Sequence, residues 1–446
     1  MSEWQKVKLS EVLTHKKGSI KIDDDTEYKL CRVRLHRRGV LLRGKQFGHE
    51  IKTKKQQVCK SGDLIVAEMD AKFGGYGFIP DELEGAIVSS HYYLYELDKN
   101  KISQNYFETL ISTDYIQNQI EAKGSTNYSS IRAKEFLEYE IPLASQELQA
   151  EISKRFLTFS DFTSKLNLEH ENQQTYLTQL RQAILQEAIE GKLTADWRVK
   201  NPVQKGNPDH DAQALLETIK AEKQKLMADG KIKKDKPLAP INPDDVPFAL
   251  PDGWVWVRLG DVCSKITDGT HHSPPNVSFG NYKYITAKNI KNDGVDLNNV
   301  TYVNSDFHEE IYKRCNPEFG DILYIKDGAT TGIVTVNNLT EQFSMLSSVA
   351  LLKPLFLNFF LMYAMRSPTF YNSIRDNMAG VAITRVTLAK IINAIIPLPP
   401  LAEQNAIVER VDRLLESVNA LELQVTERKS YAQQLMQAVL REAFAG

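Results

Sequence analysis

The sequence predicts an α+β protein with pseudo-twofold symmetry, in which two similar α/β-mixed domains are separated by two long antiparallel coiled-coil helices. The first observation is an internal repeat. IPLASQELQAEI at 141–152 resembles IPLPPLAEQNAI at 396–407, and 17 of 51 positions are identical up to Gly191 and Gly446. The second is an apolar period of 3.5 residues in both helical copies. The third is that short alternating strand patterns precede each copy. Such a long-range repeat indicates a duplicated half-molecule.

The two globular domains are expected at residues 1–143 and 253–398. Both begin with an alternating strand pattern, WQKVKLSEV at 4–12 and WVWVRLGDV at 254–262. Both continue into a β-rich run that ends in a Gly-rich loop. These runs are GDLIVAEMDAKFGGYG at 62–77 and GDILYIKDGATTG at 320–332. The two domains are therefore expected to be versions of one fold.

The long spacer helices are expected at 144–191 and 399–446. Their apolar residues alternate at +4 and +3, and about 40 residues at ~1.5 Å each make a rod of roughly 60 Å. Polar residues at Thr163, His170 and Gln173 weaken simple pairing, and either set the register or face another chain. An intramolecular antiparallel pair is favoured over two unrelated surface helices, because the repeat has no gap. The predicted seam residues are Ile152, Phe156, Phe159, Leu166, Leu177, Leu180, Ile184, Ile407, Val411, Leu414, Val418, Leu421, Val425, Leu435 and Val439.

A linker is expected at 192–252, because this stretch has no counterpart after Gly446. It contains a charged helix at 211–230 and then a basic, Pro-rich stretch that is typical of an exposed connector. The helix carries a thin apolar stripe of Leu215, Ile219 and Leu226. This stripe is either a docking face or part of an ordinary solvated surface.

Composition bounds the class of protein. The 446 residues suggest about three folding units, and a net charge of −2 argues against a uniformly basic nucleic-acid binder. Cys31, Cys59, Cys263 and Cys315 form no close pair, which excludes zinc ribbons and CxxC redox sites and fits a reducing cytoplasm. We expect no signal peptide in the opening stretch, and the most apolar run, 351–365, is too short to span a bilayer.

Sequence motifs for enzymes fail on inspection. FGGYG at 73–77 matches the loop by which many DNA methyltransferases hold their methyl donor, but no helix pattern follows it. SPPN at 273–276 resembles the catalytic tetrapeptide of amino-methyltransferases, yet Asn276 stands where an aromatic residue should stack on a flipped base. His271 and His272 have no Cys or carboxylate partner at a usable spacing for a metal, so a polar recognition loop is favoured. The sequence therefore indicates neither catalytic nor metal residues.

A strong basic stretch favours nucleic-acid binding by the first domain. Residues 29–60 carry eleven Lys or Arg against one acid, Glu50. Strand alternation would place several guanidiniums on one face of a hairpin, where Arg suits both phosphate and the O6/N7 edge of guanine. A merely solvated basic hairpin is the alternative. The candidate DNA-binding residues are Arg32, Arg34, His36, Arg37, Arg38, Arg43, Lys45, Lys72, Tyr76, Asn127, Tyr128 and Arg132.

The second domain is less basic and offers short polar side chains on Gly turns. Such side chains can read base edges without strong charge, although this pattern is weak taken alone. The candidates come from DGTHH at 268–272, YITAKNIK at 284–291, KDGATT at 326–331 and TR at 384–385. They are Thr270, His271, His272, Lys288, Asn289, Lys326, Asp327, Thr330, Thr331 and Arg385.

Several phrases together resemble the specificity subunit of type I restriction–modification enzymes over essentially the whole chain. They are IPLPPLAEQNAIVERVD, QLRQAILQEAIEGKLTADWR, QLMQAVLREAFAG, LPDGWVWVRLGDV, ITDGTHHSPP, YITAKNI and GDILYIKDGATTG. The first repeat departs from the pattern, with ASQELQAE where the second has PPLAEQNA. The combination and its order, rather than any one phrase, carry the resemblance.

The resemblance implies two target-recognition domains, each reading one half of a split duplex DNA target, with the paired helices fixing the gap. It implies no catalysis and no cofactor in this chain. Two modification subunits would use S-adenosylmethionine to methylate adenine N6, and two restriction subunits would use ATP and Mg²⁺, all in a bacterial or archaeal cytoplasm. A coiled-coil scaffold with two heads that bind no DNA is the main alternative, and an autonomous DNA-modifying enzyme is the weaker one.

Overall fold

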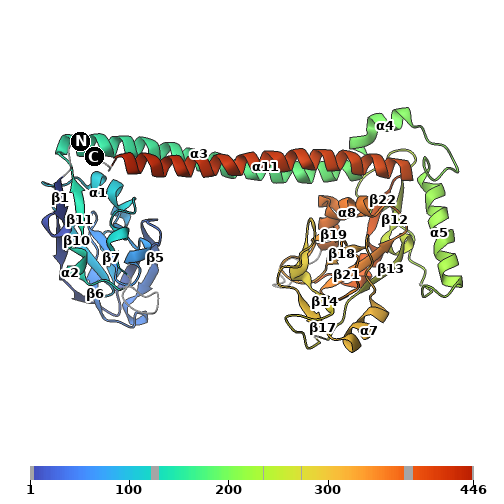
Figure 1. The fold of residues 1–446 in the computed structure, drawn as a ribbon, viewed down its shortest axis with the longest axis horizontal. Coiled ribbons are helices and arrows are strands. Elements are labelled where there is room, and N and C mark those ends of the chain that lie inside the picture. The colour runs from blue at the N-terminus through green and yellow to red at the C-terminus, as the bar shows by residue number, and fades with distance from the viewer. Residues whose placement is uncertain (1–4, 122–129, 235, 273, 376–384, 444–446) are drawn as a thin grey trace. The chain divides into compact units, whose positions relative to one another are not determined.

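The structure, a computed structural model, describes residues 5–121, 130–234, 236–272, 274–375 and 385–443. The chain forms two compact units (Figure 1). One comprises Met1–Asn172 and Val425–Gly446, and the other comprises Gln173–Gln424. Among the described residues, no helix is both long and apolar enough to cross a membrane.

The described residues of the first unit form three sheets. The central one has the order β2-β10-β7-β8, and a five-stranded sheet has the order β3-β6-β9-β4-β5. A short antiparallel pair, β1 (Gln5–Lys8) with β11 (Glu140–Leu143), joins the two ends of the domain. The other strands are β2 (Leu13–Lys16), β3 (Ile20–Lys21), β4 (Glu27–Val33), β5 (Val40–Phe47), β6 (Lys55–Val58), β7 (Leu64–Ala67), β8 (Tyr76–Phe78), β9 (Ile87–Val88) and β10 (Tyr92–Leu97).

Strand β7 is buried on both faces, which explains its unbroken apolar sequence LIVA. Leu64 and Val66 pack into a core with helix α1 (Gln104–Ile111), whereas Ile65 points into a second core that contains Val33 and Val88 of the five-stranded sheet. Because successive strand residues face opposite sides, one strand organises both cores. The Gly-rich FGGYG stretch runs from Phe73, the end of a 3-10 turn, through Gly74 and Gly75 into strand β8, so no helix starts there.

The second unit repeats this plan. Its four-stranded sheet has the order β13-β21-β18-β19, the same arrangement as β2-β10-β7-β8, and β12 pairs with β22 as β1 pairs with β11. A three-stranded sheet, β17-β14-β20, and a β15–β16 hairpin complete it. The strands are β12 (Val255–Arg258), β13 (Cys263–Asp268), β14 (Tyr282–Ile285), β15 (Ile290–Lys291), β16 (Gly294–Val295), β17 (Thr301–Val303), β18 (Ile322–Ile325), β19 (Val334–Val336), β20 (Phe343–Met345), β21 (Val349–Pro354) and β22 (Ile395–Leu398).

Strand β18 is also buried on both faces. Tyr324 points into a large core with helix α8 (Asn358–Arg366), and Leu323 points into a core with Phe343. The remaining domain helices are short. They are α2 (Ala133–Phe136) in the first unit and α6 (Leu259–Val262), α7 (Ser305–Arg314), α9 (Pro368–Arg375) and α10 (Leu388–Asn393) in the second. The predicted α+β tandem repeat is therefore confirmed at the level of strand order.

The charged linker helix packs on the core of the second unit, to which it belongs. Helix α5 (Ala212–Ala228) buries Leu215 and Ile219 in the same core as Tyr324, with exposed fractions of 6% and 1%. Asp211 caps its start by accepting a hydrogen bond from the Gln213 N–H at 3.1 Å. Of the two interpretations of its apolar stripe, the docking face is the one observed.

The long helices are α3 (Gln146–Ile189) and α11 (Leu401–Ala443). Within the second unit they pack antiparallel, since Arg181 Nη2 donates to Asn419 Oδ1 and Glu422 Oε2 at 2.6 Å each, and residues near Ile189 and Ile407 share one core. Most predicted seam residues are buried or half-buried. The buried ones are Ile152, Ile184, Ile407, Val411, Val418 and Val425, and the half-buried ones are Phe156, Phe159, Leu166 and Leu177.

Four seam predictions differ from the structure. Leu180, Leu414, Leu421 and Leu435 are 44%, 39%, 46% and 54% exposed. In the second unit the residue that follows each of these leucines faces the packed side instead. Leu415 packs on the core in place of Leu414, and Arg181 pairs with Glu422 in place of a Leu180–Leu421 contact. The physical reason is periodicity: the steps from Ile407 through Val411 and Leu415 to Val418 are 4, 4 and 3, an 11-residue repeat close to the 3.6 residues per turn of a straight helix. The side chain of Val439 lies outside the described residues.

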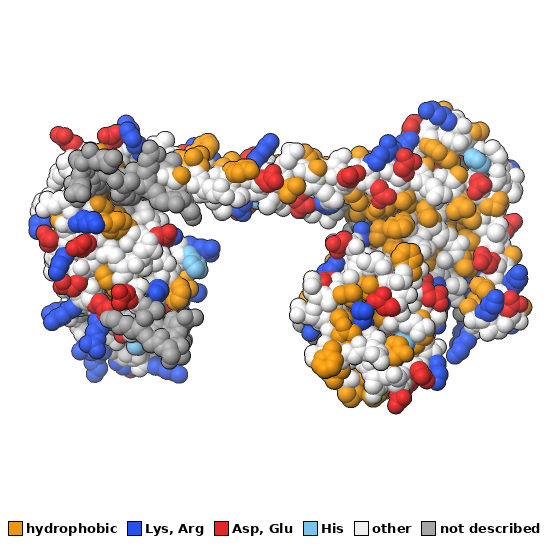
Figure 2. Space-filling view, viewed as in Figure 1, with side chains coloured by type: hydrophobic (Ala, Val, Ile, Leu, Met, Phe, Trp, Pro, Cys, Tyr) orange, Lys and Arg blue, Asp and Glu red, His pale blue; other side chains and the backbone are white. Residues whose placement is uncertain are grey.

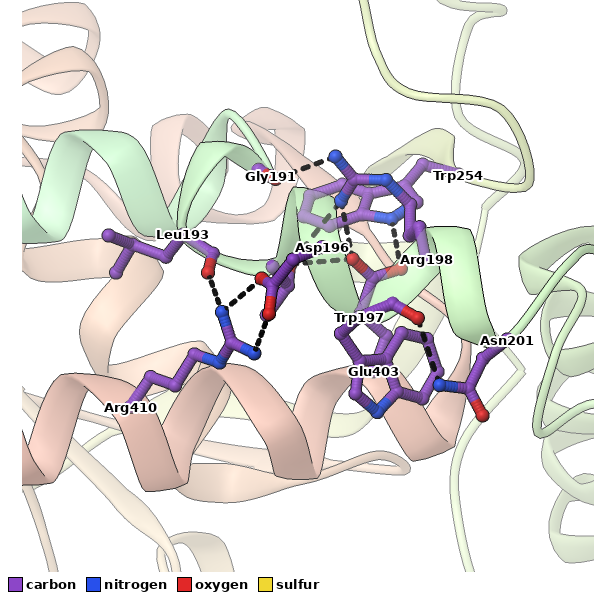
Figure 3. A network of polar contacts seen from close by, with 10 residues as sticks. Gly191, Leu193, Asp196, Trp197, Arg198, Asn201, Trp254, Glu403 and Arg410 are labelled. Carbon is purple, nitrogen blue, oxygen red and sulfur yellow. Dashed lines mark hydrogen bonds and ion pairs between the residues drawn. The ribbon is translucent and has the colours of Figure 1, made fainter.

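A buried polar network fixes the start of α11 (Figure 3). The Glu403 carboxylate, 1% exposed, accepts hydrogen bonds from Thr194 Oγ1 at 2.6 Å, Arg198 Nη1 at 2.5 Å and Trp254 Nε1 at 2.7 Å. Arg410 of the same helix forms a bidentate pair with Asp196. The network thereby ties helix α4 (Ala195–Lys200), the beginning of the second domain and the second long helix together.

Candidate nucleic-acid interface

The basic stretch of the first domain forms the predicted hairpin. Strands β4 and β5 pair antiparallel, with Arg32 opposite Leu41 and a β-bulge between Leu30 and Cys31. Cys31 and Val33 are buried, whereas Arg32 and Arg34, which alternate with them, are exposed. Figure 2 shows Lys and Arg side chains gathered over the part of this unit where Figure 1 labels β6. The exposed basic candidates of this domain are Arg32, Arg34, Arg38, Arg43, Lys45 and Arg132, and Lys72 is half-buried.

The hairpin tip has an unusual backbone. His36 and Arg37 both have positive φ, 59° and 60°, which costs a residue other than glycine about 1–3 kcal/mol. The tip is held by the next loop, because His36 N donates to Phe73 O at 2.7 Å and Arg37 N donates to Gly74 O at 3.0 Å. Gly74 permits this approach, since a Cβ there would lie 2.8 Å from Arg37 Cγ. The strained tip is therefore held in one conformation by the neighbouring loop.

Two neighbouring arginines at this tip have different surroundings. Arg37 turns inward, where its Nη1 pairs with Asp114 and contacts Gln117 Oε1 at 3.2 Å, whereas Arg38 is exposed. Arg37 therefore suits a supporting role, and Arg38 suits phosphate contact.

We expect Arg38→Ala to weaken duplex binding for every sequence and to reduce the slope of log affinity against log salt by about 0.9, the value for one phosphate contact. Arg37→Ala is the matched control. It should lower the free energy of unfolding by about 1 kcal/mol, because it removes a partly exposed ion pair and a hydrogen bond. Salt titrations of duplex affinity, with chemical unfolding beside them, measure both. An unchanged salt slope for Arg38→Ala would contradict the phosphate role.

In the second domain, three predicted phrases meet in one charged cluster. Asp268 ends strand β13, and its Oδ1 lies 3.3 Å from His271 Nε2 and pairs with Arg314. Its Oδ2 lies 3.4 Å from Lys326 Nζ. Lys326 Nζ also lies 2.9 Å from Asp327 Oδ2, and Asp327 Oδ1 lies 3.4 Å from Arg385 Nε. Residues 268–272, 326–327 and 385 are thereby brought together. We call Asp268, His271, Arg314, Lys326, Asp327 and Arg385 the charged cluster.

The other candidates of the second domain surround this cluster unevenly. Thr270 bonds His272 through its hydroxyl, at 3.0 Å to the carbonyl and 3.2 Å from the N–H, so the two shape one turn. Thr330 and Lys288 are exposed. Lys288 belongs to the turn at Ala287–Asn289, outside the charged cluster.

Several candidates are too buried to reach a base. Tyr76 is 1% exposed, and burial raises its pKa to about 12. Asn289, Lys326 and Thr331 are 5%, 2% and 4% exposed. We therefore leave these four side chains out of the proposed contact surface. Asn127 and Tyr128 lie outside the described residues.

Sequence inspection missed Arg314 and the role of Asp268. Arg314 ends helix α7, where no glycine turn or basic run marks it, and Asp268 drew attention only as the first letter of DGTHH. In the part of the chain that the structure describes, no group of three His, Cys, Asp or Glu side chains is arranged to hold a metal ion.

The same main-chain contacts hold the equivalent position in both domains. After β18, Lys326 N donates to Ser348 O at 2.9 Å and Val386 N donates to Lys326 O at 2.8 Å. After β7, Glu68 N donates to His91 O at 2.9 Å and Ile131 N donates to Glu68 O at 3.0 Å. The backbone is thus shared, whereas the side chain is a cation in one domain and a carboxylate in the other.

Comparison with known proteins agrees with this duplication. Residues 1–175 and 251–428 match the family model described as type I restriction modification DNA specificity domain. The chain is 30% identical over 251 residues to the EcoAI specificity subunit of Escherichia coli, which covers 54% of this chain and 40% of that protein. It is 26% identical over 314 residues to the EcoBI specificity subunit of Escherichia coli, which covers 68% and 57%. These matches therefore span about half the length of those relatives.

Two solved structures share the fold. A chain from a study of complex assembly and conformational transition of the type I R-M system superposes with a TM-score of 0.66 at 20% identity, covering 100% of this chain and 98% of that one. The HsdS subunit from Thermoanaerobacter tengcongensis gives 0.52 at 21% identity, covering 100% and 97%. Since the family model matches both halves of the repeat, the chain belongs to the family of type I restriction–modification DNA specificity domains.

Proposed function

We propose that the chain is the DNA sequence-recognition subunit of a type I restriction–modification complex and is itself not catalytic. The observation that carries the proposal is the duplicated framework, which presents a different charged surface in each of its two copies. One is the Arg-rich hairpin of the first domain, and the other is the charged cluster of the second. Two different readers on one chain suit a split target whose two halves differ in sequence.

The two surfaces divide the work of recognition. Phosphate contacts position a protein on DNA, whereas contacts to base edges specify the sequence. The exposed arginines of the hairpin supply cationic side chains for phosphates, and the turn of Thr270 and His272 supplies short polar groups for base edges. Residues 1–143 and 253–398 are the proposed target-recognition domains.

Residues 144–191 and 399–446 are the proposed spacer, and 192–252 the linker. A helix of 44 residues, such as α3, spans about 66 Å at ~1.5 Å per residue, so its length can fix a gap between half-sites. The exposed Leu180 and Leu421 offer apolar surface for helices of another chain.

We propose as partners two modification subunits that use S-adenosylmethionine to methylate adenine N6. Two restriction subunits would use ATP and Mg²⁺, and the assembly would work in the cytoplasm of a bacterium or archaeon. The restriction and methylation chemistry would lie wholly in these partners.

The test is a map of N6-methyladenine across the host genome, with the gene intact and deleted. One split motif should lose methylation on deletion and regain it when the gene is restored. Restoring the Arg38→Ala variant should return the same motif at lower occupancy, because a phosphate contact carries no sequence information. If restoring the gene together with those of its methyltransferase partners changes no motif, the recognition role is wrong.

A further inference from the structure

We propose that Arg314 reads a guanine in the half-site of the second domain, and that the charged cluster is a built support that aims its guanidinium. Arg385 is the second reader on the same support. The proposal rests on the proposed function and deepens it, because it assigns bases to residues. It also makes Lys326 a positioning residue rather than a DNA contact.

The support begins with a buried carboxylate. Asp268 is 2% exposed and stands between two cations: its Oδ1 pairs with Arg314 Nη2, and its Oδ2 lies 3.4 Å from Lys326 Nζ. The Lys326 side chain is 3% exposed, whereas the Arg314 side chain is 49% exposed. The buried Lys326 pairs with the Asp268 carboxylate on its interior side, and Arg314 pairs with it on its solvent side.

The support continues through a second carboxylate. Asp327 lies 2.9 Å from Lys326 Nζ and 3.4 Å from Arg385 Nε, and the Arg385 side chain is 65% exposed. One buried lysine is thus shared by two carboxylates, and each carboxylate holds one exposed guanidinium. Without counting His271, the three cations Lys326, Arg314 and Arg385 and the two carboxylates leave a net charge of +1, which favours the approach of DNA.

The geometry leaves the reading edge of Arg314 available. Its hydrogen bonds to described residues, to Asp268 and to His271 Nε2 at 3.2 Å, both use Nη2. Among the described residues, Nη1 and Nε make no hydrogen bond. Guanidinium has five donors in a rigid fork, so the remaining N–H groups can match the O6 and N7 acceptors of guanine. Holding the fork in advance reduces the conformational entropy lost on binding.

The fold itself does not require the cluster. In the first domain the equivalent of Lys326 is Glu68, which pairs instead with His91 Nδ1 at 2.9 Å, yet the strand order around it is the same. The strand order that both copies share therefore does not depend on the cluster. This leaves the exposed guanidiniums of the cluster available for recognition.

The experiment is a selection of bound duplexes from a library of random split sites, using the full-length chain with its methyltransferase partners. The wild type should select a half-site containing a guanine at a position that Arg314→Ala no longer specifies. Preference for guanine there should fall about 10- to 100-fold, the range for losing one bidentate contact. Arg314→Lys, which keeps the charge and loses the fork, should lower the preference less. Lys313→Ala, an exposed neighbour on α7, is the matched control and should leave every base preference unchanged.

Three further results decide the proposal. Asp268→Asn should relax the same position as Arg314→Ala, because the guanidinium loses its ionic support. Replacing the selected guanine with 7-deazaguanine should weaken the wild type and leave Arg314→Ala unaffected. If the wild type selects no half-site at all, the proposed function fails. If it selects one that Arg314→Ala reads equally well, only the assignment of Arg314 is overturned.

Discussion

Removing residues 178–184 from α3 together with 418–424 from α11 is expected to abolish recognition of the native split target. The affinity for that target should fall about 1,000-fold or more, to the level of non-specific binding. Each deletion removes seven residues, or about 10.5 Å of helix, which corresponds to roughly three base pairs at ~3.4 Å each. The variant should therefore recognise the same two half-sites with a gap shorter by about three base pairs.

These segments are chosen because they face each other within the second unit, where Arg181 contacts Asn419 and Glu422. The deletion joins Leu177 directly to Leu185 in α3. Both residues pack against the core, so the junction lies on the packed side of the helix. Binding to duplexes with gaps of different length measures the outcome. Gln179→Ala with Gln424→Ala is the control, since both glutamines are exposed in the same two segments and the gap should stay the same. A deletion variant that still prefers the native gap would show that the helices do not set the spacing.

Replacing Glu403 with leucine is expected to lower the free energy of unfolding of the second unit by about 3–5 kcal/mol. The carboxylate is 1% exposed, and its loss leaves the Trp254 N–H without its acceptor and the Arg198 guanidinium without its anionic partner, although Arg198 keeps its hydrogen bond to Gly191 O. For a unit of this size the melting temperature should fall by roughly 6–20 °C.

Thermal unfolding of the full-length chain, followed by calorimetry, measures this shift. Glu409→Leu is the matched control, because its side chain is 72% exposed on the same helix and such changes stay within about ±0.5 kcal/mol. Glu403→Gln should fall between the two, because its amide oxygen can still accept one hydrogen bond. A melting temperature for Glu403→Leu equal to that of the Glu409 control would show that the network does not stabilise the unit.

The repeat and its strand order could be predicted from sequence because duplicated strands keep the same apolar pattern. LIVA and ILYI both run unbroken, and in each domain that strand proves to be buried on both faces. The long helices could also be predicted, because their apolar residues recur with a helical period. The seam was predicted only in part, because a strict period of 3.5 selects Leu180 and Leu421, and the sequence does not reveal that Arg181 and Glu422 pair instead.

The charged cluster lay beyond sequence inspection. Its members come from three strands or loops and a helix end, and only the folded sheet brings Arg314 beside Asp268. The burial of Lys326 could not be predicted either. Lysine is usually a surface residue, but strand β18, which ends at Ile325, places the Lys326 side chain in the interior. In the first domain the sequence predicted that Arg32 and Arg34 alternate with buried residues. It did not reveal that Arg37 turns inward to pair with Asp114.

The main-chain clamp shared by the two domains has a consequence for how such proteins change. Glu68 and Lys326 are gripped through their N–H and C=O groups, which every residue except proline possesses in full. Mutation can therefore invert the charge at this place, as has happened between the two copies, while the grip stays intact. New specificities can then arise while the strand order of the framework is kept. The main-chain contacts thus stay constant while the side chain that they hold can change.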